Sequence, residues 1–210
     1  MNNELSANTQ AILLLTAPLI AGRNDEHVEI LKPSEYKKLA RHLIEIKRQP
    51  ADLISQDTDS IIEECQAIVD ATRIKRLLDR GFLLTQAVEK WHARAIWIVS
   101  RADVTYPQRL KKKLGENAPP ILYGCGDTTL LDKGGLAVVG SRNVDNELIE
   151  YTEHIGRLAA EARKTIVSGG ARGIDQAAMR GALDSGGRVV GVLADNLERA
   201  AMNRDNRNML

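Results

Sequence analysis

The strongest constraint on the fold is an alternation of apolar runs and helical patterns between Gly135 and Ala194. Three short runs, 136–139, 165–167 and 189–193, are rich in valine, leucine and isoleucine. Such continuous runs are typical of strands buried on both faces of a sheet. Helical patterns over 146–163 and 174–183 separate them. This alternation predicts an α/β fold, a Rossmann-like and mostly parallel sheet with right-handed crossovers and helices on both faces.

Two glycine-rich turns follow the first two predicted strands. The first reads Gly140-Ser141-Arg142-Asn143, and the second, from 168 to 175, reads SGGARGID. Glycine lets backbone N–H groups approach a ligand closely, and a helix beginning near Gly173 directs its unpaired N–H groups and positive dipole end to the same place. Ligands of such sheets sit beyond the carboxyl ends of the strands. Arginines in both turns add planar cations that match phosphate oxygens.

These features together predict an oxyanion site, most simply for phosphate, although glycine-rich turns also occur as plain connectors. We expect Asp175, three residues after Arg172, to hold that arginine or to cap the turn, and not to act in catalysis. The residues expected to bind phosphate are Gly140, Ser141, Arg142, Asn143, Ser168, Gly169, Gly170, Arg172 and Gly173.

At these residues the chain resembles the DprA/Smf family of DNA-processing proteins. The resemblance rests on AVVGSRN at 137–143, SGGARGIDQAAMRGAL at 168–183 and GGRVVGVLA at 186–194, with weaker support at 103–110 and 119–124. It covers 103–210, about half of the chain. Many members have leucine in place of Gly170 and a glycine-rich turn in place of 195–198. The family's sheet continues past this point, so the chain resembles a divergent, C-terminally truncated member.

The resemblance implies a function in DNA uptake, transformation or recombination. A DprA-like protein would bind single-stranded DNA through its phosphates, at the residues named above, and would hand it to a RecA-type recombinase. It would be a homodimer and would need no cofactor or metal. Recognition of this kind is independent of base sequence and sensitive to salt.

The remainder of the chain is predicted to be mostly helical. We expect a helical domain over 1–94, with a short buried helix near 8–15, followed by a Rossmann-like domain over 95–210. A basic cluster, Arg109 and 111–113, lies on a predicted helix. Such a cluster is usually a solvated face, and the alternative is a contact with DNA phosphates.

Composition excludes several other classes of protein. The 29 basic and 28 acidic residues leave a net charge of +1, so any affinity for a polyanion must come from a local patch. Aromatic residues make up only 3%, which disfavours a row of base-stacking rings. Two cysteines favour reduced thiols in a cytoplasmic protein over a disulfide framework. No apolar run is long enough to span a membrane, and no basic residue precedes the apolar run 11–15 as in a signal peptide.

Two other functions are compatible with the motifs. The same turns suit a nucleotide or a nucleotide-derived signal, although neither GxxxxGK[ST] nor GxGxxG is present. An enzyme would need a base beside Ser141 or Ser168, and the four histidines at 27, 42, 92 and 154 are distant in sequence. We therefore predict a non-catalytic binding protein.

Overall fold

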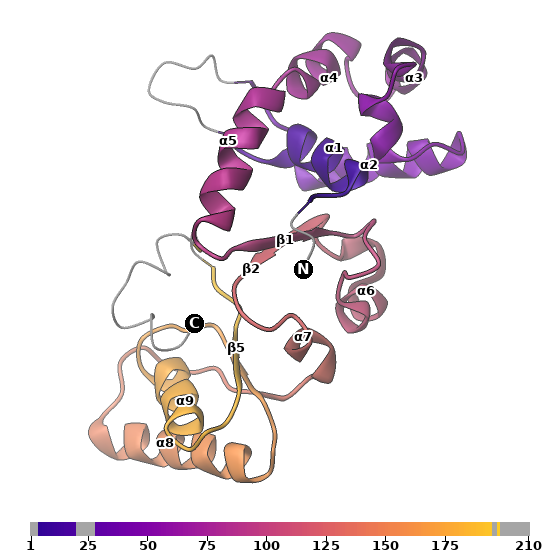
Figure 1. Ribbon diagram of the computed structural model, residues 1–210. Helices are drawn as coiled ribbons and strands as arrows, with labels where there is room; N and C mark the ends of the chain where they lie inside the picture. The colour runs from indigo at the N-terminus through magenta and orange to yellow at the C-terminus, as the bar shows by residue number, and fades with distance from the viewer. Residues whose placement is uncertain (1–3, 20–27, 195–196, 198–210) are drawn as a thin grey trace. The chain divides into compact units, whose positions relative to one another are not determined.

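The computed structural model describes residues 4–19, 28–194 and 197, and its contacts divide the chain into two compact units, 1–124 and 125–210 (Figure 1). From the sequence we also expect a helix to begin at Asn196, ahead of a polar stretch at 203–210, and apart from 197 this part of the chain lies outside the described residues. The first unit contains α1 (Ala7–Thr16), α2 (Pro33–Glu45), η1 (Pro50–Ile54), α3 (Thr58–Cys65), α4 (Ala71–Leu78), α5 (Gly81–His92), β1 (Trp97–Ser100), α6 (Gln108–Leu114), η2 (Gly115–Asn117) and β2 (Ile121–Gly124). The second contains α7 (Leu130–Lys133), β3 (Leu136–Ala137), α8 (Asn146–Glu161), β4 (Ile166–Ser168), α9 (Ile174–Leu183) and β5 (Val189–Gly191).

Helix α1 forms the centre of the first unit, as expected for an apolar stretch without a polar face. Its N-terminus is capped by Ser6, whose Oγ accepts a hydrogen bond from the backbone N–H of Thr9 at 3.1 Å. At the other end, the buried guanidinium of Arg80 donates to the backbone carbonyls of Leu14 and Ala17. Both ends of this helix therefore have partners for backbone groups that would otherwise be unpaired.

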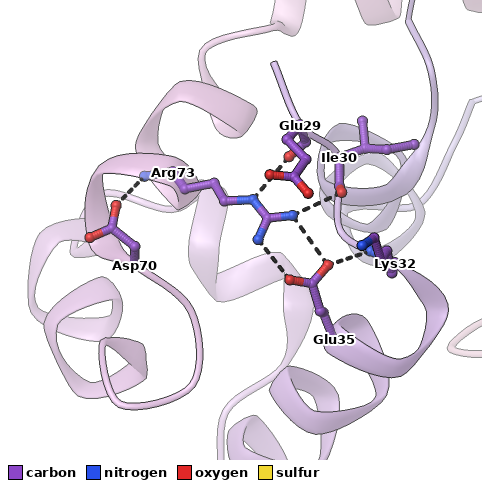
Figure 2. Close-up of polar contacts among 6 residues, drawn as sticks. All are labelled: Glu29, Ile30, Lys32, Glu35, Asp70 and Arg73. Carbon is purple, nitrogen blue, oxygen red and sulfur yellow. Dashed lines mark hydrogen bonds and ion pairs between the residues drawn. The ribbon is translucent and has the colours of Figure 1, made fainter. Parts of the chain in front are cut away.

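An arginine clamp joins α4 to the start of α2 (Figure 2). The guanidinium of Arg73 donates to both carboxylate oxygens of Glu35, at 2.7 and 3.2 Å, and to the backbone carbonyls of Glu29 and Ile30. The backbone N–H of Lys32 also donates to Glu35, at 2.7 Å. The Arg73 hydrogen bond, followed by that of Lys32, lowers the pKa of Glu35 to about 2. The clamp therefore carries a carboxylate that stays ionised well into the acid range.

The division between the units falls after Gly124, whereas the sequence placed a domain boundary at 94/95. Strands β1 and β2 form an antiparallel pair, and Ile98 and Ile121 pack against the helical core around α1. Asp103, just after β1, accepts hydrogen bonds from the hydroxyls of Ser6 and Thr9 at 2.6 Å each. These contacts attach the hairpin to the helices that precede it in the sequence.

The second unit contains the predicted parallel sheet. Its spatial order is β3-β4-β5, with Leu136 paired to Ile166 and Ile166 paired to Val189. Helices α8 and α9 lie side by side (Figure 1), and close approach is possible because Gly156 and Gly181 stand where they meet. Because the strands follow one another in spatial order, right-handed crossovers bring both helices to the same face. The two helices and the sheet share a small hydrophobic core that includes Ala159, Ile166, Ala178, Met179 and Ala182.

Candidate functional site

The carboxylate of Asp175 draws the two glycine-rich turns together. It is 5% exposed and accepts hydrogen bonds from the backbone N–H groups of Gly140, Gly169 and Ala171, at 3.2, 3.1 and 3.4 Å. Gly140 belongs to the turn after β3, and the other two belong to the turn after β4. One side chain at the start of α9 therefore fixes the geometry of both turns. The sequence predicted that Asp175 would hold Arg172 or cap the turn. Its contacts with backbone N–H groups are those of a turn cap, and within the described residues no hydrogen bond or ion pair joins it to Arg172.

Glycine is required where the turns touch. Gly173 has a φ of +89°, and a Cβ there would lie 2.3 Å from the carbonyl oxygen of Ser141. A Cβ on Gly140 would lie 2.7 Å from the side chain of Ile174. The backbone N–H of Ile174 donates to the carbonyl of Ser141 at 3.2 Å. The two turns are therefore in direct contact at the N-terminus of α9.

This contact changes the expected source of anion-binding groups. The sequence predicted that the turn amides and the first N–H groups of α9 would face a ligand. Instead, three turn amides bind Asp175, and the N–H groups of Ile174 and Gln176 donate to the carbonyls of Ser141 and Ala171. The glycine-rich turns do bind an anion, but the anion is the protein's own carboxylate.

The two serines also use their hydroxyls within the protein. Ser141 Oγ accepts from the N–H of Asn143 at 3.1 Å and donates to its carbonyl at 3.0 Å. Ser168 is 3% exposed, and its Oγ donates to the carbonyl of Val138 at 2.7 Å. Ser168 therefore joins β4 to the residue that follows β3, and its buried hydroxyl proton is used in that bond and not in binding a ligand.

Arginine side chains supply the cationic character of the site. A hollow of about 310 Å³ lies beside the two turns and is lined by Arg142, Asn143, Arg172, Gly173 and further residues from both helices. Arg142 and Arg172 are exposed, and within the described ranges neither guanidinium has a hydrogen-bond or ion-pair partner. The remaining predicted ligands, Gly140, Ser141, Ser168, Gly169 and Gly170, do not line it.

The sequence analysis missed six residues that line the hollow, and two of these, Gln176 and Arg180, have polar side chains on α9. Gln176 and Arg180 lie on α9 and complete one wall of the hollow. Arg180 forms an ion pair with Glu153 of α8 at 3.1 Å, so its charge is partly neutralised. Gln176 lies three residues after Gly173, and Arg180 lies four residues after Gln176. This helical spacing places both side chains on the same face of α9 as Gly173, and it could have predicted them from the sequence.

The described residues show no constellation for hydrolysis or metal binding. No group of three His, Cys, Asp or Glu side chains within them could hold a metal ion. Of the histidines, His42 donates from Nε2 to the backbone carbonyl of Glu64 in α3, and His154 is exposed on α8, while His27 lies outside the described residues. No helix in the part of the chain that is described is long and apolar enough to cross a membrane.

Comparison with known proteins assigns the family. A sequence model of the DNA recombination-mediator protein A family matches residues 97–210, more than half of the chain. The chain belongs to this family. The match includes both glycine-rich turns, Asp175 and the arginines of the hollow.

Named relatives agree with the family assignment. DNA processing protein DprA of Bacillus subtilis is 28% identical over 132 residues, covering 62% of this chain and 44% of that protein. DNA processing protein DprA of Streptococcus pneumoniae is 37% identical over 96 residues, covering 46% of this chain and 33% of that protein. The chain thus matches less than half the length of either DprA.

The fold is also that of a DprA protein. The X-ray structure of DprA from Streptococcus pneumoniae superposes with a TM-score of 0.62 at 20% identity, covering 98% of this chain and 65% of that one. The likeness includes the helical first unit as well as the α/β second unit, and it supports the α/β class predicted from the sequence.

Proposed function

We propose that this chain binds the phosphate backbone of single-stranded DNA and acts in DNA recombination or uptake. The observation that carries the proposal is the pair of guanidiniums, Arg142 and Arg172, which have no partner among the described residues and line one hollow of a DNA recombination-mediator protein A family member. Guanidinium groups match phosphate oxygens in two-pronged hydrogen bonds. Because the lining contributed by the described residues includes no aromatic ring, we infer that binding rests on charge and is independent of base sequence.

The alternative ligand, a nucleotide or nucleotide-derived signal, has less support. Mononucleotide and dinucleotide sites of α/β sheets hold phosphate on backbone N–H groups at glycine-rich turns. In this chain three of those groups, at Gly140, Gly169 and Ala171, bind Asp175. Side chains around an open hollow suit a strand that passes across the surface better than a small molecule that must be enclosed.

Family membership extends the proposal beyond DNA binding. On that ground we propose that the protein works in the cytoplasm as a homodimer, presents bound single strands to a RecA-type recombinase, and does so without a cofactor or catalysis. The resemblance to DprA proteins supports each of these points.

Anisotropy titration of fluorescent oligo-dT with the full chain tests the proposed site. We expect the double variant Arg142→Ala/Arg172→Ala to bind more weakly, with the slope of log K against log salt reduced by about 1.4, or roughly 0.7 for each phosphate that is no longer neutralised. The matched control is Arg157→Ala/Arg188→Ala, which removes two exposed arginines of the same unit outside the hollow. Equal binding by the two double variants would refute the proposed site.

A thermal-shift screen against nucleotides addresses the alternative. The proposal predicts no stabilisation by mononucleotides at concentrations where oligo-dT stabilises the protein. A shift with a nucleotide that disappears in Arg142→Ala/Arg172→Ala would replace DNA with a small ligand at the same hollow.

A further inference from the structure

A second group of cations lies in the first unit, on residues other than those of the glycine-rich turns. It gathers around Glu116 and Asn117 of η2, and its members come from α2, from the residue after β1, and from α6. We call it the Glu116 cluster, and its cations are Lys37, Arg41, Arg101 and Lys111.

The contacts within the Glu116 cluster are specific. Arg41 and Lys37 approach the carboxylate of Glu116 at 2.8 and 3.4 Å. Arg101 donates to the backbone carbonyl of Glu116 at 3.3 Å, and Lys111 donates to the backbone carbonyl of Arg101 at 3.1 Å. The last two cations therefore bind neutral acceptors, and within the described residues no ion pair compensates their charge.

The charge of the cluster is out of balance. The cluster has four cations and the one carboxylate of Glu116, which only Lys37 and Arg41 contact, and Lys112 and Lys113 follow Lys111 on the short helix α6. Both of these lysines are exposed, and within the described part of the chain neither has a hydrogen-bond or ion-pair partner. The chain as a whole has a net charge of only +1. A local excess of this size, built from three elements, is the electrostatic signature of a polyanion surface.

The surroundings favour a nucleic acid over a membrane. Stable binding of a helix at a membrane surface combines cations with an apolar helix face. Helix α6 has seven residues, and its Leu110 packs against the core residues Val99 and Tyr106, so that Leu114 is left as its one exposed apolar side chain. Successive phosphates of a strand match several cations spread over three elements.

We propose that the Glu116 cluster, with Lys112 and Lys113, is a second phosphate-binding surface for single-stranded DNA. Glu116 acts as a resident counter-ion that phosphate displaces from Lys37 and Arg41. The Glu116 side chain is 64% exposed, and exposed ion pairs of this kind contribute little to stability. Replacing Glu116 by phosphate at Lys37 and Arg41 therefore costs the protein little stability. The ligand is taken from the proposed function, while the residues are separate from the hollow.

The sharpest test is a gain of affinity. Replacing Glu116 by Gln removes the competing carboxylate, and we expect oligo-dT to bind roughly two- to fivefold more tightly, the factor expected for an exposed charge pair. Glu89→Gln, an exposed glutamate on α5 of the same unit, removes the same charge elsewhere and is expected to have no such effect. Equal gains for the two variants would show bulk charge alone and would overturn the proposal.

A loss of affinity completes the test. Lys112→Glu should weaken binding and reduce the salt slope by at least about 0.7, the value for one phosphate contact. Lys90→Glu, on the exposed face of α5, is the matched control. Circular dichroism and thermal unfolding confirm that each variant is folded. No difference between Lys112→Glu and its control would also overturn the proposal.

The same variants in the Arg142→Ala/Arg172→Ala background separate this proposal from the first. Responses to Glu116→Gln and Lys112→Glu that persist there support an independent surface, even if the hollow itself does not bind DNA. If DNA binding depends on the hollow alone, the result supports the proposed function and refutes the second phosphate-binding surface. Preferential binding of phosphatidylglycerol vesicles over oligo-dT at equal phosphate would assign the cluster to a membrane and refute it.

Discussion

Replacing Asp175 by Asn tests whether a single carboxylate organises both glycine-rich turns. One carboxylate oxygen accepts from Gly140, and the other accepts from Gly169 and Ala171. Asn retains one oxygen, so its NH₂ group must face at least one backbone donor whichever way the amide is turned.

The expected cost follows from these contacts. Leaving one buried N–H without an acceptor costs about 1–3 kcal/mol, and the remaining hydrogen bonds lose the strength that a charged acceptor provides, so the total is about 2–4 kcal/mol. Urea unfolding followed by far-UV circular dichroism measures the loss of global stability. Native-state hydrogen exchange measures the loss of local stability in the turns, and the protection factors of the three amides should fall by roughly thirtyfold or more.

Asp184→Asn is the matched control, because it removes the same charge from an exposed aspartate at the C-terminal end of α9. DNA binding should weaken in Asp175→Asn and remain unchanged in Asp184→Asn, since only the former displaces the turns that carry Arg142 and Arg172. If the two variants show the same amide protection at 140, 169 and 171, Asp175 does not organise the turns and the reasoning fails.

Three further predictions concern stability. Arg80→Met leaves backbone carbonyls at the end of α1 without a donor and should destabilise the first unit by about 1–3 kcal/mol in urea unfolding, with unchanged stability as the contradicting result. Gly181→Ala places a Cβ 2.0 Å from a backbone oxygen of α8 and should cost about 1–3 kcal/mol, whereas Gly81→Ala, with open space around it, should be neutral; equal effects would show that helix contact is not the cause. The pKa of Glu35 is lowered in the folded state, so its contribution to stability is complete above the ordinary value of 4.5 and is lost as pH falls towards about 2; Arg73→Met should flatten this part of the stability–pH profile, and an unflattened profile would argue against the clamp.

Much of the second unit was readable from local patterns. The apolar runs became β3, β4 and β5, and the intervening helical patterns became α8 and α9 close to their predicted bounds. Strand, turn and helix are decided by interactions between residues near in sequence, so short windows suffice. The same holds for the buried helix α1, predicted at 8–15 and observed at Ala7–Thr16.

The first unit shows where local patterns are insufficient. Strands β1 and β2 were correctly expected as strands but were assigned to the α/β domain. Their partners are each other and the helices before them, through Ile98, Ile121 and the Asp103 hydrogen bonds. Such contacts join residues more than ninety positions apart in the case of Ser6 and Asp103, and no periodicity records them.

The amino-acid sequence by itself determined that two glycine-rich turns, each with an arginine, stand at the carboxyl ends of neighbouring parallel strands. Only the tertiary structure decided which groups there remain available to a ligand. Backbone amides have the same chemistry at every residue, so their partners depend on which side chain folding brings within hydrogen-bond distance. Here that side chain is Asp175, which binds three of the amides, while the guanidinium groups of Arg142 and Arg172 line the hollow.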